Sequence, residues 1–205
     1  MKVLLLNGSP HTKGCTYTAL CEIEKELNKH GIDTEIFQVG KVGSGCIGCL
    51  GCKRNGECVF KDSLNEFTAK AEGADGFIFG SPVHYASASG NITSFLDRAF
   101  YSNSKAFAYK PGACIVTCRR GGATAAFDQL NKYFTISNMP VVSSQYWNMV
   151  HGNTPEEVIQ DKEGMQIMRT LGKNMAWLLK CIEAGKNSGV MLPEKEDKVM
   201  TNFIR

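Results

Sequence analysis

Hydrophobic positions along the chain form two alternating patterns: short apolar runs, and longer segments with an apolar residue every three or four positions. The runs at residues 3–6, 76–82 and 113–118 are typical of strands buried on both faces of a parallel sheet. The run at 32–39 carries more polar residues and predicts a strand at the sheet edge. A short run at 139–144 predicts a fifth strand.

The segments between these runs have the apolar spacing of amphipathic helices. The predicted helices span residues 16–30, 64–72, 89–100, 127–134 and 155–184. Strands that alternate with helices form a parallel sheet covered by helices on both faces, with right-handed crossovers. Five strands within about 145 residues predict an α/β, flavodoxin-like three-layer sandwich, whose five-stranded parallel sheet has the order 2-1-3-4-5.

Composition and charge narrow the class of protein. The 205 residues are 43% hydrophobic and 21% charged, as in an ordinary globular protein, and we expect one domain over residues 1–184 followed by a tail at 185–205. A net charge of +3 without a basic run does not indicate a nucleic-acid surface. The longest apolar run, residues 175–179, is too short to cross a membrane. The chain starts without the long apolar stretch of a secretory signal, so we expect a cytoplasmic protein.

The nine cysteines are an odd number, which argues against a disulfide framework. Cys114 and Cys181 lie in apolar surroundings and are expected to be buried free thiols. Four others fall within the loop at residues 44–61, and their spacing is considered below.

The loops that follow the strands are expected to meet. In a parallel sheet every strand-to-helix loop leaves from the carboxyl edge, which is where open α/β sheets bind ligands. The predicted rim therefore gathers the loops at residues 7–16, 40–61, 80–89, 118–124 and 144–154.

The first of these loops, "NGSPHTKGCTYT", has the composition of a phosphate site. Ser9, Thr12, Thr16 and Thr18 supply hydroxyls, and the helix start supplies free backbone N–H groups and a positive dipole end. Neither the Walker A pattern nor G-x-G-x-x-G is present. The alternative is a polar turn that merely caps the helix.

The second and third loops carry side chains that suit a flat, anionic ligand. In "GSPVHYASASGNITSFLDR", His84 and Tyr85 come just after the strand, where they could lie against a ring. In "TCRRGGATAAF", Arg119 favours anionic groups, and Gly121 and Gly122 allow close approach to the backbone. A half-buried tyrosine, a surface histidine and a solvated basic turn are the corresponding structural alternatives.

The combination of "GSPHTKGCTYT", "GSPVHYASASGNITSFLDR" and "CRRGG" resembles the NADPH-dependent FMN reductase family over about residues 1–150. The cysteine segment resembles that of its iron–sulfur flavoprotein branch. The resemblance implies a flavodoxin-like FMN-binding domain in which the first loop holds the phosphate and the other two flank the ring. Many members have Arg at the position of His11 and Asn at that of Cys15. The residues expected to bind FMN are Ser9, His11, Thr12, Cys15, Thr16, Tyr17, Thr18, Pro82, Val83, His84, Tyr85, Thr117, Arg119, Gly121 and Gly122.

The four clustered cysteines, Cys46, Cys49, Cys52 and Cys58, are spaced C-x2-C-x2-C-x5-C, and three uses compete for them. Thiolates on a compact loop can hold a 4Fe–4S cluster, and the resembled branch uses this motif for one. All-cysteine zinc sites more often pair two C-x2-C hooks across a longer spacer. The third use is none, with thiols that stay reduced or partly oxidised.

We therefore expect an FMN-dependent electron-transfer oxidoreductase, with a 4Fe–4S cluster on the 46–58 loop passing electrons to or from FMN. Hydride transfer to flavin needs no protein acid or base, so no catalytic residue is assigned. The expected donor is NAD(P)H or ferredoxin, and the acceptor a small molecule or a protein. The alternatives are a cluster-free NAD(P)H-dependent FMN or quinone reductase and a zinc-stabilised interaction module. The Met-rich last helix, the cysteine loop and the resemblance also suggest a homodimer or homotetramer.

Overall fold

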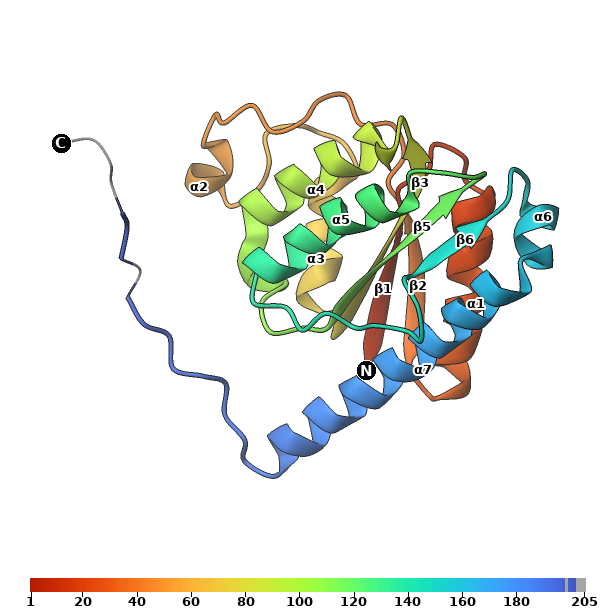
Figure 1. The fold of residues 1–205 in the computed structure, drawn as a ribbon. Coiled ribbons are helices and arrows are strands. Elements are labelled where there is room, and N and C mark those ends of the chain that lie inside the picture. Colours follow the sequence, from red (N-terminus) through yellow and green to blue (C-terminus); the bar gives the residue numbers. More distant parts are fainter. Residues whose placement is uncertain (198, 202–205) are drawn as a thin grey trace.

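A computed structural model describes residues 1–197 and 199–201 of the chain. Over these residues a six-stranded sheet is flanked by helices (Figure 1). The strands are β1 (Lys2–Asn7), β2 (Asp33–Gln38), β3 (Gly76–His84), β4 (Ser87–Ala88), β5 (Gly112–Cys118) and β6 (Met149–His151). The helices are α1 (Cys15–Lys29), α2 (Gly51–Asn55), α3 (Leu64–Glu72), α4 (Gly90–Asn103), α5 (Ala123–Ile136), α6 (Pro155–Gln160) and α7 (Lys162–Asn187), with a 3-10 turn at Ser104–Ala106.

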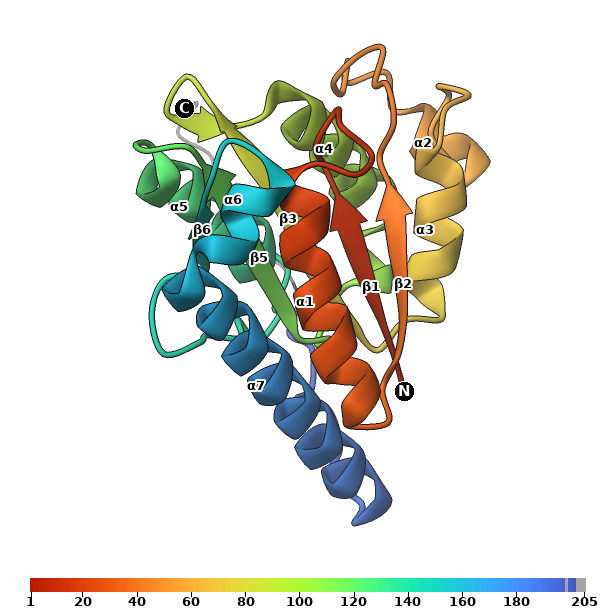
Figure 2. The same ribbon diagram turned by 90° about the vertical axis from the view of Figure 1, so that its right-hand side faces the viewer.

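The sheet separates two hydrophobic cores, which makes a three-layer sandwich (Figures 1 and 2). Successive side chains of a strand point to opposite faces. Leu4 and Leu6 of β1 therefore pack with residues of α3, α4 and α5, whereas Val3 and Leu5 pack with residues of α1 and α7. Burial on both faces explains why the central strands are uninterrupted apolar runs in the sequence.

The strand order confirms the flavodoxin-like prediction. The parallel strands lie in the order β2-β1-β3-β5-β6, which is 2-1-3-4-5 when they are counted along the chain. The two-residue β4 was not expected; it pairs antiparallel with the end of β3. The more polar β2 lies at the edge, as predicted.

The predicted strand at 139–144 is wrong. Val141 makes only an isolated bridge to Gly112, although the backbone around it is hydrogen-bonded to the start of β5. The chain then leaves the sheet and returns as β6, which pairs with the other end of β5. The edge is thus split into two short pieces, and the second is too short for a clear hydrophobic run.

The predicted helix at 155–184 is two helices separated by Asp161. Asp161 has a non-helical backbone (φ −72°, ψ 81°), and its carboxylate accepts a hydrogen bond from the N–H of Gly164 at 2.9 Å. Such a side-chain acceptor caps a new helix start. Met168 and Met175 of α7 are fully buried in the core that includes α1, so this methionine stripe is covered within the chain and gives no support for an oligomer.

The chain beyond α7 forms no helix or strand at 188–197 or 199–201, and runs away from the body in Figure 1. The tail predicted at 185–205 therefore starts slightly later, and residues 198 and 202–205 lie outside the described residues. Cys114 is buried as predicted, but Cys181 is exposed on α7. Of the helices described, none combines the length and apolar character that a membrane span requires.

Candidate functional site

Register brings the carboxyl ends of the strands level with one another. Asn7 at the end of β1 lies opposite Gln38 of β2 and Gly80 of β3. Pro82 of β3 lies opposite Thr117 of β5. The loops that follow these strands consequently start side by side on one rim (Figure 2).

The first and third loops meet through a hydrogen bond between two buried hydroxyls. Thr16 Oγ1 and Thr117 Oγ1 are 2.8 Å apart, and both residues are almost completely buried. Thr16 stands in the first turn of α1 and Thr117 near the end of β5. Two of the residues expected to bind FMN are thus in direct contact although they lie 101 positions apart.

Asn7 fixes the shape of the first loop from beneath. Its side-chain amide N–H groups face the carbonyls of His11 and Thr12 at 3.4 and 3.3 Å, and its Oδ1 accepts from the N–H of Ser9 at 3.2 Å. Gln38 accepts from the Asn7 amide at 2.7 Å and donates to the Ser9 carbonyl at 2.8 Å. These two supporting residues were not predicted from the sequence; in the structure each is the last residue of its strand, β1 and β2.

The start of α1 lacks the side-chain cap that many helices have, and its first turn holds no acidic residue. The first backbone N–H groups of a helix have no partner within the helix, and its N-terminus carries a partial positive charge. Ser9 is buried, and its hydroxyl accepts from the N–H of His11 at 3.1 Å, whereas His11 and Thr12 are exposed.

The second loop is a tight hairpin that packs against the third loop. Tyr85 and Ala86, which join β3 to β4, both have positive φ, 50° and 59°. That conformation costs a non-glycine residue about 1–2 kcal/mol. Gly122 at the start of α5 has φ 90°, and a Cβ at this position would lie 2.6 Å from the Cα of Ala86 and 2.9 Å from Cγ1 of Val83. Only a glycine lets the two loops approach this closely.

The other residues predicted to bind FMN differ from one another in exposure and contacts. His84, Tyr85, Arg119 and Gly121 are exposed, while Pro82 and Val83 are half-buried. Tyr17 and Thr18 line a surface hollow with residues of α6 and α7, such as Ile159 and Arg169. The Thr18 hydroxyl donates to the carbonyl of Gly14, the residue that precedes α1. The Cys15 thiol donates to the Gly152 carbonyl at 3.8 Å, and its burial raises the pKa of Cys15 above the ordinary value.

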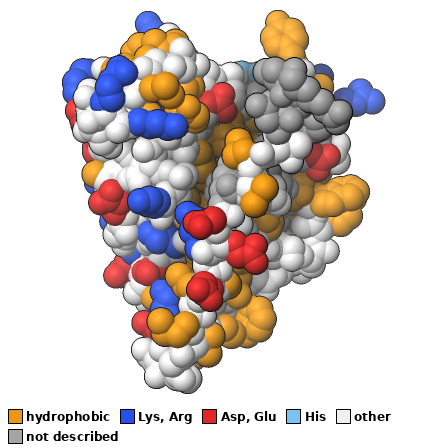
Figure 3. Space-filling model, turned by 90° about the vertical axis from the view of Figure 1, so that its left-hand side faces the viewer, with side chains coloured by type: hydrophobic (Ala, Val, Ile, Leu, Met, Phe, Trp, Pro, Cys, Tyr) orange, Lys and Arg blue, Asp and Glu red, His pale blue; other side chains and the backbone are white. Residues whose placement is uncertain are grey.

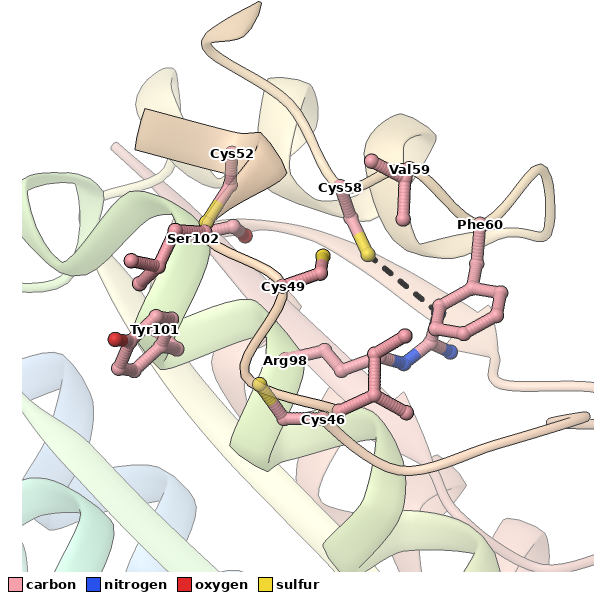
Figure 4. A pocket seen from close by; sticks show the side chains of 11 residues that line it. Cys46, Cys49, Cys52, Cys58, Val59, Phe60, Arg98, Tyr101 and Ser102 are labelled. Carbon is pink, nitrogen blue, oxygen red and sulfur yellow. Dashed lines mark hydrogen bonds between the residues drawn. The ribbon is translucent and has the colours of Figure 1, made fainter. Parts of the chain in front are cut away.

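The four clustered cysteines line one pocket, which we call the thiol pocket (Figure 4). Cys52 comes from α2, Cys46 and Cys49 from the segment before it, and Cys58 from the segment after it. Cys46 and Cys49 are exposed, Cys52 is half-buried and Cys58 is buried. Arg98 and Tyr101 of α4 form its inner wall.

Glycines in the cysteine loop meet specific backbone demands. Gly48 has φ 66°, which favours glycine. A Cβ at Gly51 would lie 2.3 Å from a methyl group of Val59, so glycine lets the two arms of the loop close on each other. Gly45 packs loosely against Ser94, where a Cβ would meet only ordinary contacts.

The thiol pocket lies away from the rim rather than on it. The base of the loop is held at the start of α4, where Asn91 bonds to Val42 and Gly40. The loop then follows α4 to Arg98, eight residues beyond Gly90. At 1.5 Å per residue this is about 12 Å along the helix axis. The loop therefore starts beside the first loop, as predicted, but its thiols lie farther along α4.

The thiols are not arranged as a closed zinc site. Within the described part of the chain, no three Cys, His, Asp or Glu side chains are placed to hold one metal ion. Structural zinc needs four ligands about 2.0–2.3 Å from a single ion. A 4Fe–4S cluster spreads its thiolates over separate iron atoms, so they stand farther apart. Holding any metal group requires the thiols to turn toward a common centre, and the exposure of Cys46 and Cys49 leaves them room to do so.

Arg98 is the residue of the thiol pocket that sequence reasoning missed. Its neighbour in the sequence, Asp97, does not pair with it but accepts a hydrogen bond from the Tyr133 hydroxyl. Arg98 is buried and pairs with Asp62, and its Nη1 lies 3.8 Å from Sγ of Cys58. Burial opposes its charge, but pairing with Asp62 outweighs this, so the pKa of Arg98 lies above its usual value.

Comparison with known proteins decides the family. A family model described as NADPH-dependent FMN reductase matches residues 1–154. The chain belongs to this family. An iron–sulfur flavoprotein of Methanocaldococcus jannaschii is 32% identical over 196 residues, covering 89% of this chain and 100% of the relative. This member of the FMN reductase family thus falls in the iron–sulfur flavoprotein branch, and it is an FMN-dependent oxidoreductase.

Solved structures support the fold of this family member. The structure of RosB with a bound intermediate, 8-demethyl-8-formylriboflavin-5'-phosphate, aligns with a TM-score of 0.71 at 15% identity, covering 100% of this chain and 94% of that one. An archaeal flavodoxin aligns with a TM-score of 0.61 at 16% identity, covering 88% of this chain and 99% of that one. Similarity at this level of identity shows a shared flavodoxin-like architecture.

Proposed function

We propose that residues 1–184 form one FMN-binding domain and that FMN binds at the rim where the three loops meet. The observation that carries this proposal is the contact of the loops, through the Thr16–Thr117 hydrogen bond and the close approach of Gly122 to Ala86. The open start of α1, free of acidic residues, suits the phosphate dianion. RosB, which shares this fold, holds a riboflavin-5'-phosphate derivative, and this supports a flavin ligand for the present chain by analogy.

Each loop has a distinct task in this proposal. The backbone N–H groups of residues 15–17 bind phosphate oxygens, with Asn7 holding the loop in shape. The hairpin at residues 82–86 and the turn at 117–122 flank the ring, and Arg119 favours a ring that carries negative charge. FMN, when bound, supplies the exchange of a hydride with a donor and of single electrons with a metal centre.

We also propose that Cys46, Cys49, Cys52 and Cys58 hold a 4Fe–4S cluster, which supplies one-electron transfer. The convergence of four thiols on one pocket supports this. The function is then electron transfer between the cluster and FMN, with ferredoxin or NAD(P)H as donor. Within one chain the two centres are then separated by about 12 Å along α4.

A cluster-free NAD(P)H-dependent FMN or quinone reductase is the second candidate. The observation that favours it is that the thiols are not already gathered around one centre. Steady-state rates separate the candidates. Efficient exchange with reduced ferredoxin is expected for the cluster protein, and fast NAD(P)H oxidation with a quinone acceptor for the cluster-free one. Cys52→Ser should abolish the ferredoxin reaction, with Cys181→Ser, an exposed thiol on α7, as the matched control.

We propose a homodimer or homotetramer, and the exposed apolar side chains support this. Ile47, Leu50 and Val59 of the cysteine loop are each more than 40% exposed. Figure 3 shows hydrophobic side chains on both sides of a hollow on the face of the molecule that carries α2 and the C-terminal segment. A second chain covering the loop would bury this exposed apolar surface. Sedimentation at micromolar concentration tests this, and a monomer would count against it.

We propose a cytoplasmic location, since nine free cysteines suit a reducing compartment. The electron acceptor is then a small molecule or a protein of the same compartment. Fractionation of cells, with the protein detected by antibody, tests the location, and recovery from the medium would contradict it.

A further inference from the structure

Arg98 is an unusual residue for the wall of a thiol pocket. Its side chain is buried, with only 2% of the residue exposed, and it enters the pocket from α4. Its two terminal nitrogens donate to Asp62, one of them at 3.3 Å, and Nη1 also faces Sγ of Cys58 at 3.8 Å. Figure 4 shows the guanidinium turned toward Cys58 and lying beside the Phe60 ring, whose centroid is 5.3 Å away.

The hydrogen bonds within the chain leave part of this guanidinium unused. Its Nε–H is buried and has no acceptor among the described residues. A buried donor without a partner is destabilising, and buried charges are normally both paired and fully hydrogen-bonded. The salt bridge to Asp62 therefore explains how the guanidinium is held in place. It does not explain why a side chain with five N–H donors lines the thiol pocket. The guanidinium is thus left with a donor for which the described residues supply no acceptor.

Sulfur ligands of a metal centre are acceptors of the required kind. Hydrogen bonds and charges near the sulfur atoms of a cluster set its reduction potential and hold its ligands in place. We infer that Arg98 is a positioning residue of the thiol pocket, which orients Cys58 by donating to its sulfur and stabilises the reduced state of the metal centre through its positive charge. This inference rests on the proposed 4Fe–4S cluster.

Substitution of Asp62 gives a test of the inference, because it should shift the reduction equilibrium in the opposite direction to substitution of Arg98. Asp62 fixes the guanidinium and offsets part of its charge. Removing the cation from the wall disfavours the added electron of the reduced state. Removing the Asp62 carboxylate leaves the cation uncompensated, which favours that electron. The two substitutions break the same salt bridge, so a purely structural role predicts changes of one sign only.

The experiment is an anaerobic redox titration of the reconstituted full-length protein, followed by visible absorption and electron paramagnetic resonance. Arg98→Gln is expected to shift the one-electron reduction equilibrium toward the oxidised state by about tenfold, which is about 59 mV. Asp62→Asn is expected to shift it in the opposite direction, and Arg98→Lys, which keeps the charge, to stay nearer to the parent than Arg98→Gln. Lys53→Gln removes an exposed cation from the same loop and is the matched control, with less than about a twofold change expected because solvent screens it.

Iron and sulfide content of the parent protein separates the two hypotheses. A parent that takes up no iron under anaerobic reconstitution overturns the cluster proposal and this inference with it. A loaded parent whose potential is unmoved by Arg98→Gln, or moved in the same direction by Asp62→Asn, overturns the role of Arg98 alone. If Arg98→Gln does not fold, Asp62→Asn decides the matter: a shift toward the reduced state that exceeds the change in Lys53→Gln supports the role of Arg98, and no shift or one toward the oxidised state overturns it.

Discussion

Gly122→Ala is expected to weaken FMN binding by disturbing the contact between the second and third loops. Gly122 has φ 90°, in the region that side chains rarely adopt. Its new Cβ would lie 2.6 Å from the backbone Cα of Ala86, so the hairpin that carries Tyr85 must move. The perturbation adds a single methyl group and no charge, so its effect reports on geometry.

The size of the effect follows from the strain. Left-handed backbone costs a non-glycine residue about 1–2 kcal/mol. The free protein can relieve strain and clash by moving the exposed hairpin, but FMN binding requires the hairpin in place. The strain then appears as lost affinity, about 5- to 30-fold, since 1.4 kcal/mol corresponds to tenfold in the dissociation constant.

The assay is titration of the apoprotein with FMN, followed by quenching of flavin fluorescence. Gly31→Ala is the matched control, because Gly31 also has positive φ, 75°, but has no atom within 4 Å of the Cβ position and follows α1 at the opposite edge of the sheet. Both variants should lose about 1–2 kcal/mol of unfolding free energy or less. Equal FMN affinities for both variants would refute the placement of FMN between these loops.

Two further predictions concern stability. Thr117→Val leaves the buried Thr16 hydroxyl without its partner and should lower the unfolding free energy by about 1–3 kcal/mol, as measured by urea titration. The Thr16→Val/Thr117→Val double variant should recover part of this loss, because neither hydroxyl is then left unpaired. Strict additivity of the two single changes would contradict this. The hydrogen bonds from Lys2 and Lys70 lower the pKa of Glu35 in the folded protein. The contribution of Glu35 to the unfolding free energy is therefore fully present above its unfolded pKa of about 4.3, and it is lost as the pH falls through the lower, folded pKa. Glu35→Gln should therefore cost about 0.5–1 kcal/mol near neutral pH and nothing in acid, and a deficit independent of pH in thermal unfolding would be inconsistent with it.

The sheet was predictable because burial on both faces leaves a direct mark on sequence. The runs at residues 3–6, 76–82 and 113–118 had no competing helical spacing, and their order along the chain fixed the topology. The prediction of the last edge strand was wrong because β6 contains only three residues and is separated from Val141 by a segment outside the sheet. The helix break at Asp161 was not predicted because the apolar spacing continues across it.

The site was predictable only as far as loops and motifs determine it. Strand ends and helix starts place Thr16 and Thr117 on one rim, which their hydrogen bond reflects. Arg98 could not be found in this way. Its partners Asp62 and Cys58 lie 36 and 40 positions earlier, and no local pattern encodes that contact. The distance of the thiol pocket from the rim likewise depends on how the cysteine loop follows α4, which its composition does not specify.

The most direct measurement is the content of iron, acid-labile sulfide and FMN in one sample purified and reconstituted without oxygen. The expected result is about four iron atoms and four sulfides together with about one FMN per chain, and loss of the iron but retention of FMN in Cys58→Ser. A protein that binds FMN but no iron under these conditions would contradict the role of the four cysteines.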